Sequence, residues 1–219
     1  MNEFRIIKES KDPKILVVTP LLPGHKISKE TKKTIKRNDI PFTWITSTGN
    51  NNIPTNLKLG LEWYGDLPPY YFMLDNDVIL GRHLLDRLYE KLDNSKYNVA
   101  FSYASFRFKG YMNYKFPAIP FDINRLLQQH NYISSNSLFS TDITMKVGLV
   151  TDNKYQRLLD HCFLLKLFYN GYIGIPCPEA NFIAIASKES ISAGSKLEYN
   201  IKRKLVIEDF CRPIIDKYS

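Results

Sequence analysis

Residues 70–80, YYFMLDNDVIL, constrain the fold of this chain more than any other stretch. The stretch begins with an apolar run typical of a β-strand that is covered on both faces, and the run ends at two carboxylates, Asp75 and Asp77. Side chains at positions i and i+2 of an extended chain point to the same side, so the two carboxylates converge if the chain stays extended there. The pattern predicts a buried strand that ends in an acidic site.

Two convergent carboxylates form a hard oxygen site that suits Mg²⁺ or Mn²⁺ bridging the phosphates of a nucleotide. Asp77 and Asp75 are therefore the candidate metal ligands. A tight turn is the competing interpretation, because the side chains of Asp75, Asn76 and Asp77 can all hydrogen-bond to nearby backbone groups. These residues alone leave both interpretations open.

Short apolar runs alternate with helical patterns along the chain, which is typical of an α/β fold. Strands are expected at residues 14–19, 42–46, 98–103, 172–175 and 181–186. Helices are expected at residues 29–37, 56–64, 82–92 and 155–169. A chain of 219 residues is long enough for one well-cored domain of this class.

The composition and the hydrophobic pattern indicate in which cellular compartment the protein is expected to work. No apolar run approaches the roughly 20 residues of a membrane-spanning helix, and the N-terminus lacks the apolar segment of a signal peptide. The three cysteines form no CxxC pair, which favours reduced thiols in the cytoplasm. The expected protein is a cytoplasmic one without a transmembrane segment.

The net charge of +8 favours anionic partners, such as a nucleotide diphosphate, an anionic membrane surface, a phosphorylated glycan or a nucleic acid. Residues 106–116, FRFKGYMNYKF, interleave aromatic rings with cations, which suits stacking on sugars or bases. A β-hairpin with alternating faces accounts for the same pattern without a ligand. Both interpretations of this strip remain open.

A strand ending in Leu-Asp-Asn-Asp-Val, preceded by an αβ pattern and followed by YISSNSLF at residues 132–139, resembles the glycosyltransferases of the GT-A fold, family 2 above all. The similarity covers roughly residues 14–192. It implies an α/β fold with a mixed central sheet flanked by helices and a single domain over residues 1–219. Within that domain it implies a nucleotide-binding half at about 14–80 and an acceptor-side half at about 81–195. A basic C-terminal tail follows at about 196–219, where Lys202, Arg203 and Lys204 favour a solvated helix over a binding device.

The resemblance also implies roles for individual residues around a nucleotide-sugar. The expected contacts are Thr19, Pro20, Thr46, Asn56, Asp75 and Asn76. Many relatives have an acidic residue at the end of the second strand, where this chain has Thr46 followed by hydroxyl and amide side chains. Ser134, Ser135 and Asn136 are expected in the wall of the sugar pocket, with backbone turn bonding as the alternative.

Asp160 is the one acid in the apolar helical pattern of residues 155–169. Without the resemblance, it is an acid that complements the helix dipole. Matching the pattern to the family's catalytic helix makes Asp160 the base that deprotonates the acceptor, although Leu159 replaces the family's Glu. His161 is the alternative base, and it projects about 100° away around the helix.

The resemblance therefore predicts an inverting, metal-assisted hexosyltransferase-type enzyme that uses Mn²⁺ or Mg²⁺. It would move a sugar from a nucleotide diphosphate to a hydroxyl acceptor, which could be a glycan, a lipid-linked glycan or a nucleic acid, with peripheral membrane contact an open question. Many relatives have a metal-binding His near residues 187–196, where this chain offers Lys188 or Lys196. Retaining chemistry, a nucleotidyltransferase and a nucleic-acid-binding module are the alternatives.

Overall fold

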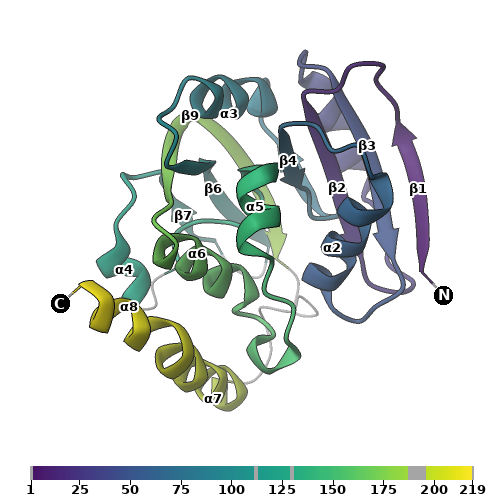
Figure 1. Cartoon of the computed structure of the whole chain (residues 1–219). Helices are drawn as coiled ribbons and strands as arrows, with labels where there is room; N and C mark the ends of the chain where they lie inside the picture. The colour runs from purple at the N-terminus through teal and green to yellow at the C-terminus, as the bar shows by residue number, and fades with distance from the viewer. Residues whose placement is uncertain (1, 111–112, 129–130, 187–195, 219) are drawn as a thin grey trace.

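The computed structural model describes residues 2–110, 113–128, 131–186 and 196–218 as one nine-stranded sheet flanked by helices (Figure 1). The strands are β1 (Glu3–Lys8), β2 (Ile15–Leu21), β3 (Phe42–Thr48), β4 (Tyr70–Met73), β5 (Val78–Leu80), β6 (Val99–Gly110), β7 (Lys115–Phe116), β8 (Leu138–Ser140) and β9 (Ile173–Ala186). Their order is β1-β3-β2-β4-β8-β6-β9-β5, and β7 pairs with β6.

The sheet is mixed, as expected. β2 runs parallel to both β3 and β4, and β6 runs parallel to β9, whereas the other neighbours are antiparallel. Because β2, β3 and β4 are parallel, their carboxyl ends meet at one edge of the sheet. Ligands of open α/β sheets bind at such an edge.

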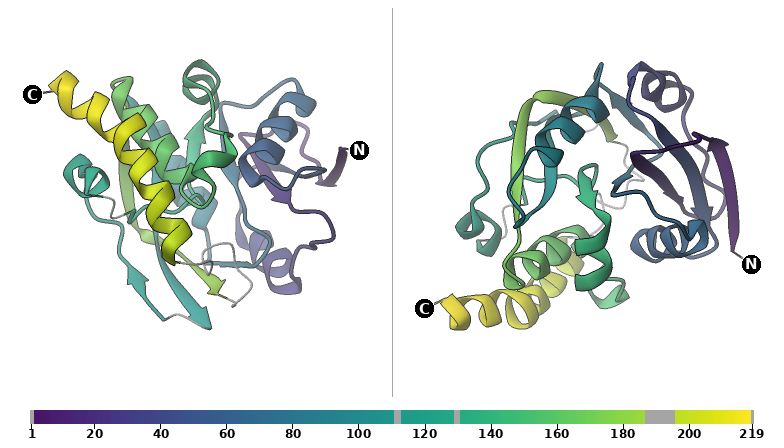
Figure 2. Two further views of the ribbon diagram at one scale, coloured as in Figure 1. Left: turned by 90° about the horizontal axis from the view of Figure 1, so that it is seen from below. Right: turned by 45° about the horizontal axis from the view of Figure 1, so that its top comes forward.

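Helices cover both faces of the sheet (Figure 2). They are α1 (Lys29–Thr34), α2 (Ile53–Tyr64), α3 (Leu84–Asp93), α4 (Ile123–Leu127), α5 (Thr141–Val147), α6 (Leu159–Tyr169), α7 (Lys196–Val206) and α8 (Arg212–Tyr218). Shorter turns lie at η1 (Ile35–Arg37), η2 (Asn153–Tyr155) and the π-helical η4 (Ile207–Cys211). One core cluster joins the sheet to α2 and α6, and a second joins its other face to α3.

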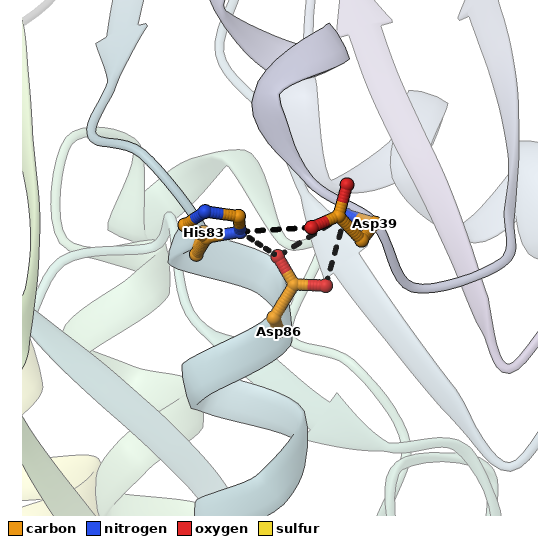
Figure 3. A group of neighbouring side chains, drawn as sticks. All are labelled: Asp39, His83 and Asp86. Carbon is orange, nitrogen blue, oxygen red and sulfur yellow. Dashed lines mark hydrogen bonds and ion pairs between the residues drawn. The ribbon is translucent and has the colours of Figure 1, made fainter.

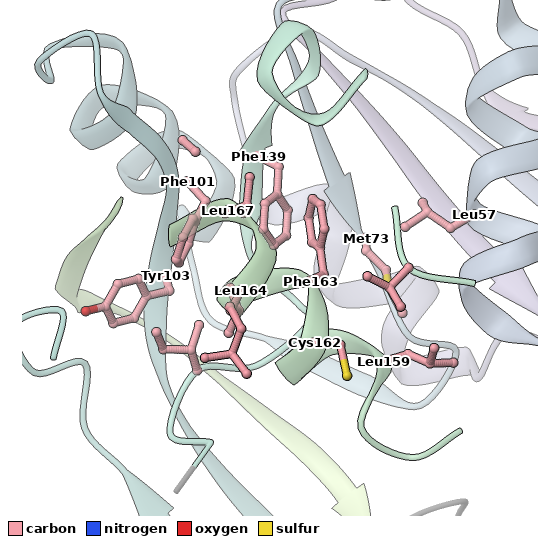
Figure 4. Packing of buried hydrophobic residues seen from close by; sticks show 14 of the residues in the cluster. Leu57, Met73, Phe101, Tyr103, Phe139, Leu159, Cys162, Phe163, Leu164 and Leu167 are labelled. Carbon is pink, nitrogen blue, oxygen red and sulfur yellow. The ribbon is translucent and has the colours of Figure 1, made fainter. Parts of the chain in front are cut away.

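The core on the α6 side explains why this helix is so apolar. Phe163 from α6 packs beside Phe139 of β8, with their ring centroids 5.6 Å apart, and Met73 of β4 belongs to the same cluster (Figure 4). Leu57 from α2 lies across from them. The sequence pattern at residues 155–169 predicted this buried helix, which begins at Leu159 after the short turn η2.

Several strand boundaries differ from the prediction. β2 continues past Thr19 through Pro20 to Leu21, because its pairing with β3 extends beyond its pairing with β4. The two strands expected at residues 172–175 and 181–186 form the single strand β9. Its register against β6 jumps from Cys177 to Asn181, so the residues between them bulge out. Of the YISSNSLF segment at 132–139, only Leu138 and Phe139 lie in a strand, β8, and β1 was not predicted.

The aromatic strip at residues 106–116 packs as part of the sheet. Phe106 stacks on Phe116 and on Phe182, with centroid separations of 4.6 Å and 5.4 Å. Phe106 and Phe116 face each other across the antiparallel pair β6–β7. The described residues of the strip therefore form a β-hairpin whose stacked rings serve packing.

The C-terminal segment is part of the core as well as basic. Val206, Cys211 and Ile214 are buried and belong to the cluster that contains α6. The expectation of a solvated tail is therefore wrong for one side of these helices. All three cysteines are free thiols, as predicted, and all three are buried. None of the helices in the described ranges is long and apolar enough to cross a membrane.

Candidate functional site

Residues 70–80 form both structures that the sequence left as alternatives, a buried strand and then a turn at the acidic residues. β4 ends at Met73, and the chain turns at Asn76 and Asp77 before β5 begins. The chain is therefore not extended from Asp75 to Asp77, and the alternation of side chains along a strand does not bring these two carboxylates together. Both side chains are partly exposed, but only Asp75 lines a cavity of about 200 Å³, and Asp77 lies on the turn outside that lining.

Asn76 holds this turn against the segment before α1. Its side-chain amide donates to the carbonyl of Lys26 at 3.1 Å. Its own carbonyl accepts hydrogen bonds from the Ser28 N–H at 2.8 Å and from the Thr31 hydroxyl at 3.1 Å. Ser28 also caps α1, because its hydroxyl accepts the backbone N–H of Thr31. These contacts give Asn76 a structural task, and they fix the position of the neighbouring Asp77.

Asn136 holds Asp75 from the other side. Its Oδ1 accepts the backbone N–H of Asp75 at 2.9 Å, and its Nδ2 donates to Asp75 Oδ2 at 2.7 Å. The Ser134 hydroxyl contacts the same amide group at 3.3 Å. Asn136 is 1% exposed. The side chain expected in the sugar pocket wall is thus engaged with the candidate metal ligand.

Asp160 lines the same cavity from the first turn of α6. Its Oδ2 accepts a hydrogen bond from Asn131 Nδ2 at 3.1 Å, and its Oδ1 accepts the backbone N–H of His161 at 2.8 Å. The structure therefore brings Asp75 and Asp160 to one cavity, although they are far apart in the sequence. Ser134 and Ser135 also line it.

Burial dominates the electrostatics of both carboxyl groups. Desolvation raises the pKa of Asp75 to about 6, the Asn136 hydrogen bond opposes this rise, and the charges of Asp77 and Asp160 add to it. Desolvation also raises the pKa of Asp160, and hydrogen bonds from His161 N–H, its own N–H and Asn131 oppose that rise. Both side chains remain partly exposed in the cavity, and acids whose pKa values are raised at such a place are typical of functional sites.

The rest of the cavity wall is largely apolar, with polar groups at a few positions. Asn51 and Asn52 contribute amides, and Gln156 and Arg157 lie near Asp160 along the chain. Arg157 has a backbone φ of 79°, in the left-handed region that non-glycine residues rarely adopt. The sequence offered a signal for the two asparagines in its run of hydroxyl and amide residues after Thr46, but none for Arg157.

The other expected nucleotide contacts lie close to this edge but outside the cavity lining. Thr19, Pro20 and Thr46 are buried, and the Thr19 hydroxyl accepts a hydrogen bond from Trp44 Nε1 at 2.9 Å. Asn56 is 0% exposed, and its amide group bonds to the carbonyls of Leu21 and Asn50. These side chains shape the ends of β2 and β3 and present little surface to a ligand.

Two further predictions concern Asn56 and His161. α2 begins at Ile53 with Asn52 as its N-cap, so Asn56 does not open the helix as expected. His161 is 1% exposed and is absent from the cavity lining, and burial lowers its pKa to about 4. Its ring therefore faces away from the site that Asp160 lines. Lys188 lies outside the described residues, as does the side chain of Lys196.

One group of three metal-ligating side chains occurs among the described residues, and it lies elsewhere (Figure 3). His83 Nδ1 is 3.2 Å from Asp39 Oδ2 and 3.3 Å from Asp86 Oδ2. The Asp86 carboxylate also accepts the backbone N–H groups of Asp39 and Ile40. Asp39 precedes the amino end of β3, opposite the edge that holds Asp75. The group therefore fastens α3 to the turn before β3.

No protein-family model matches the sequence, and a search of curated proteins gives no match. Solved structures of TarS from S. aureus do match. TarS 1-349 in complex with UDP-GlcNAc has a TM-score of 0.65 at 11% identity, over 89% of this chain and 66% of that chain. TarS 1-349 in complex with UDP has a TM-score of 0.62 at 12% identity, over 88% and 64%.

A longer TarS structure matches with a TM-score of 0.60 at 11% identity. The match covers 39% of that TarS chain, so this chain spans well under half of its length. At such identities the likeness shows the fold alone. The predicted fold class, a GT-A-type α/β fold with a mixed sheet flanked by helices, is confirmed.

Proposed function

We propose that this chain is a glycosyltransferase that moves a sugar from a UDP-sugar to a hydroxyl acceptor, with inversion at the anomeric carbon. The observation that carries the proposal is the cavity that Asp75 and Asp160 line together, at the edge where the parallel strands end. The likeness to TarS structures in complex with UDP-GlcNAc and UDP supports the fold and suggests the donor class.

Asp75 and Asp77 are proposed to hold the diphosphate end of the donor through Mn²⁺ or Mg²⁺. Their donor set fits such an ion, because carboxylate oxygens are hard ligands and Mg²⁺-type sites are completed by water and phosphate oxygens. The partly exposed Asp77 and the cavity-lining Asp75 flank a turn that Asn76 fixes in place. A divalent cation bound there would supply positive charge to the leaving diphosphate.

Asp160 is proposed to act as the general base. Its carboxylate would take the proton of the acceptor hydroxyl while the acceptor oxygen forms its bond to the anomeric carbon. The bond from that carbon to the diphosphate oxygen breaks at the same time, and the nucleoside diphosphate leaves with the electron pair. A carboxylate placed in this way typically accelerates such a step by ~10²- to 10⁴-fold.

The base and ribose of the donor are proposed to lie along the ends of β2 and β3. Thr19, Pro20, Thr46 and Asn56 shape this edge from within, since their side chains are buried. The amides that line the cavity at the start of α2 belong to Asn51 and Asn52. Amide groups can both donate and accept, as recognition of a pyrimidine base requires.

Calorimetric titration with UDP, GDP, CDP, ADP and dTDP tests this proposal, each with Mn²⁺, with Mg²⁺ and with a chelator. We expect UDP to bind in the presence of metal, and Asp77→Ala to weaken that binding by roughly tenfold or more, because it removes a charged ligand. Asp66→Ala, an exposed acid at the end of α2, is the matched control. Absence of binding by all five nucleotides would overturn the proposal.

A further inference from the structure

Both candidate acids are held by one short segment of the chain, residues 131–136. Asn136, at its end, contacts Asp75, and Asn131, at its start, contacts Asp160. The two asparagines stand 61 and 29 residues away from their respective acids in the sequence. The segment therefore connects two carboxylates from different parts of the fold, one just after the end of β4 and one in the first turn of α6.

The hydrogen bonds fix the orientation of the Asn136 amide. Its Oδ1 accepts the Asp75 N–H, so its Nδ2 must face the Asp75 carboxylate. The Ser134 hydroxyl oxygen lies 3.1 Å from the Asn136 backbone nitrogen and 3.3 Å from Asn136 Nδ2, and it helps to hold the Asn136 side chain in place. A buried amide with these three partners cannot rotate freely, and its contact with Asp75 Oδ2 leaves Oδ1 of that carboxylate for a ligand.

Asn131 is oriented in a similar way. Its Oδ1 accepts the backbone N–H of Ile133 at 3.2 Å, which directs its Nδ2 to Asp160 Oδ2. The Asp160 carboxylate is fixed at its other oxygen by the His161 N–H. Each Asp160 oxygen keeps further lone-pair capacity, so the carboxylate can still accept a proton.

We propose that Asn136 and Asn131 are positioning residues that set the places of Asp75 and Asp160 in the site, Asn136 for donor binding and Asn131 for the transfer step. The assignment of these two effects rests on the proposed function. We expect the two effects to be separable because each asparagine contacts one of the two acids, and the two asparagines lie at opposite ends of residues 131–136. Asn136, which was expected in the wall of the sugar pocket, thus acts here through Asp75.

Two single variants test the separation. Asn136→Ala removes the donor to Asp75, and we expect metal-dependent UDP affinity to fall by roughly tenfold or more in calorimetry. Asn131→Ala removes the donor to Asp160, and we expect UDP affinity to stay within about twofold of wild type. The turnover number for hydrolysis of UDP-GlcNAc, with water in place of the acceptor, should fall by roughly tenfold.

Asn124→Ala is the matched control, because Asn124 is exposed on α4 and its substitution should change neither quantity. If Asn136→Ala does not fold by circular dichroism, Ser134→Ala carries the same test with a smaller loss of affinity, since it removes the hydroxyl that holds the Asn136 amide. Equal losses of affinity and turnover in both asparagine variants would overturn the proposal, because they would indicate a general structural defect.

Failure of the proposed function can be told apart from failure of this inference. If wild-type protein binds no nucleotide, crystal structures of the two variants still decide. The Asp75 carboxylate should leave its wild-type place in Asn136→Ala and keep it in Asn131→Ala, and Asp160 should show the reverse. Unmoved carboxylates in both variants would refute the positioning roles whatever the protein binds.

Discussion

Asp75→Asn should make the protein more stable at neutral pH while it removes the candidate ligand. Burial raises the pKa of Asp75 from 3.8 to about 6, so the folded protein binds a proton at this site that the unfolded chain has already released. Such a group favours folding below its unfolded pKa, and this contribution is lost as pH rises through the folded pKa of about 6. Above that pH the folded state carries a partly desolvated negative charge that asparagine would not have.

The size of the effect follows from the difference between the two pKa values. A rise of about two in the Asp75 pKa corresponds to a gain of about 3 kcal/mol in the free energy of unfolding of Asp75→Asn over wild type at pH 7.5. This gain shrinks below about 1 kcal/mol at pH 4. The introduced asparagine would keep an oxygen that accepts from Asn136 Nδ2, so the substitution leaves that contact intact. For a chain of 219 residues, the melting temperature at pH 7.5 should rise by roughly 6–12 °C.

Urea unfolding of both proteins at pH 4.0 and pH 7.5 measures these differences directly. Asp66→Asn provides the control, because Asp66 is exposed and its substitution should leave stability nearly unchanged at both pH values. A gain of the same size at both pH values would show that the stabilisation has nothing to do with ionisation. Equal stability of wild type and Asp75→Asn at pH 7.5 would refute the reasoning.

Two further substitutions separate chemistry from structure. Asp160→Asn should lower the rate of sugar transfer from the UDP-sugar donor by ~10²- to 10⁴-fold with unchanged UDP affinity in calorimetry, and full activity of the variant would remove its assignment as the base. Asp86→Ala should lower the free energy of unfolding by about 1–3 kcal/mol in urea titrations, because it leaves the backbone N–H groups of Asp39 and Ile40 without their acceptor. An Asp86→Ala protein as stable as wild type would show that the contacts between α3 and the turn before β3 contribute nothing measurable.

The sequence predicted the elements with strong periodicity and missed those decided by neighbours in space. The leucines of α3 and the apolar run of β4 have periodic patterns that local reasoning detects. The first of the expected strands, by contrast, was predicted to stop at Thr19, before Pro20, whose backbone cannot donate a hydrogen bond to a neighbouring strand. Pro20 is accommodated because β2 pairs with β4 only as far as Val18, so Pro20 lies where the strand keeps a single partner.

The candidate site shows the same division. Asp75 and Asp160 stood out in the sequence as acids in apolar surroundings, and the structure places both on one cavity. Their partners Asn136 and Asn131 could not be assigned, because the contacts depend on how distant segments meet. Thr19 and Asn56 were expected to touch a ligand, and their burial could be seen only once β2, β3 and α2 were packed together.

The hydrogen bonds that residues 131–136 make to Asp75 and Asp160 also have a consequence for the kinetics of folding. Contacts between segments so far apart in the chain must overcome the loop-closure entropy of all the residues between them, so they tend to form late in folding. β4 and α6 can each form before the segment joins them, and we expect the spacing between Asp75, which follows β4, and Asp160 of α6 to be set only afterwards. We expect the ability to bind a nucleotide to be among the last properties that a refolding chain regains.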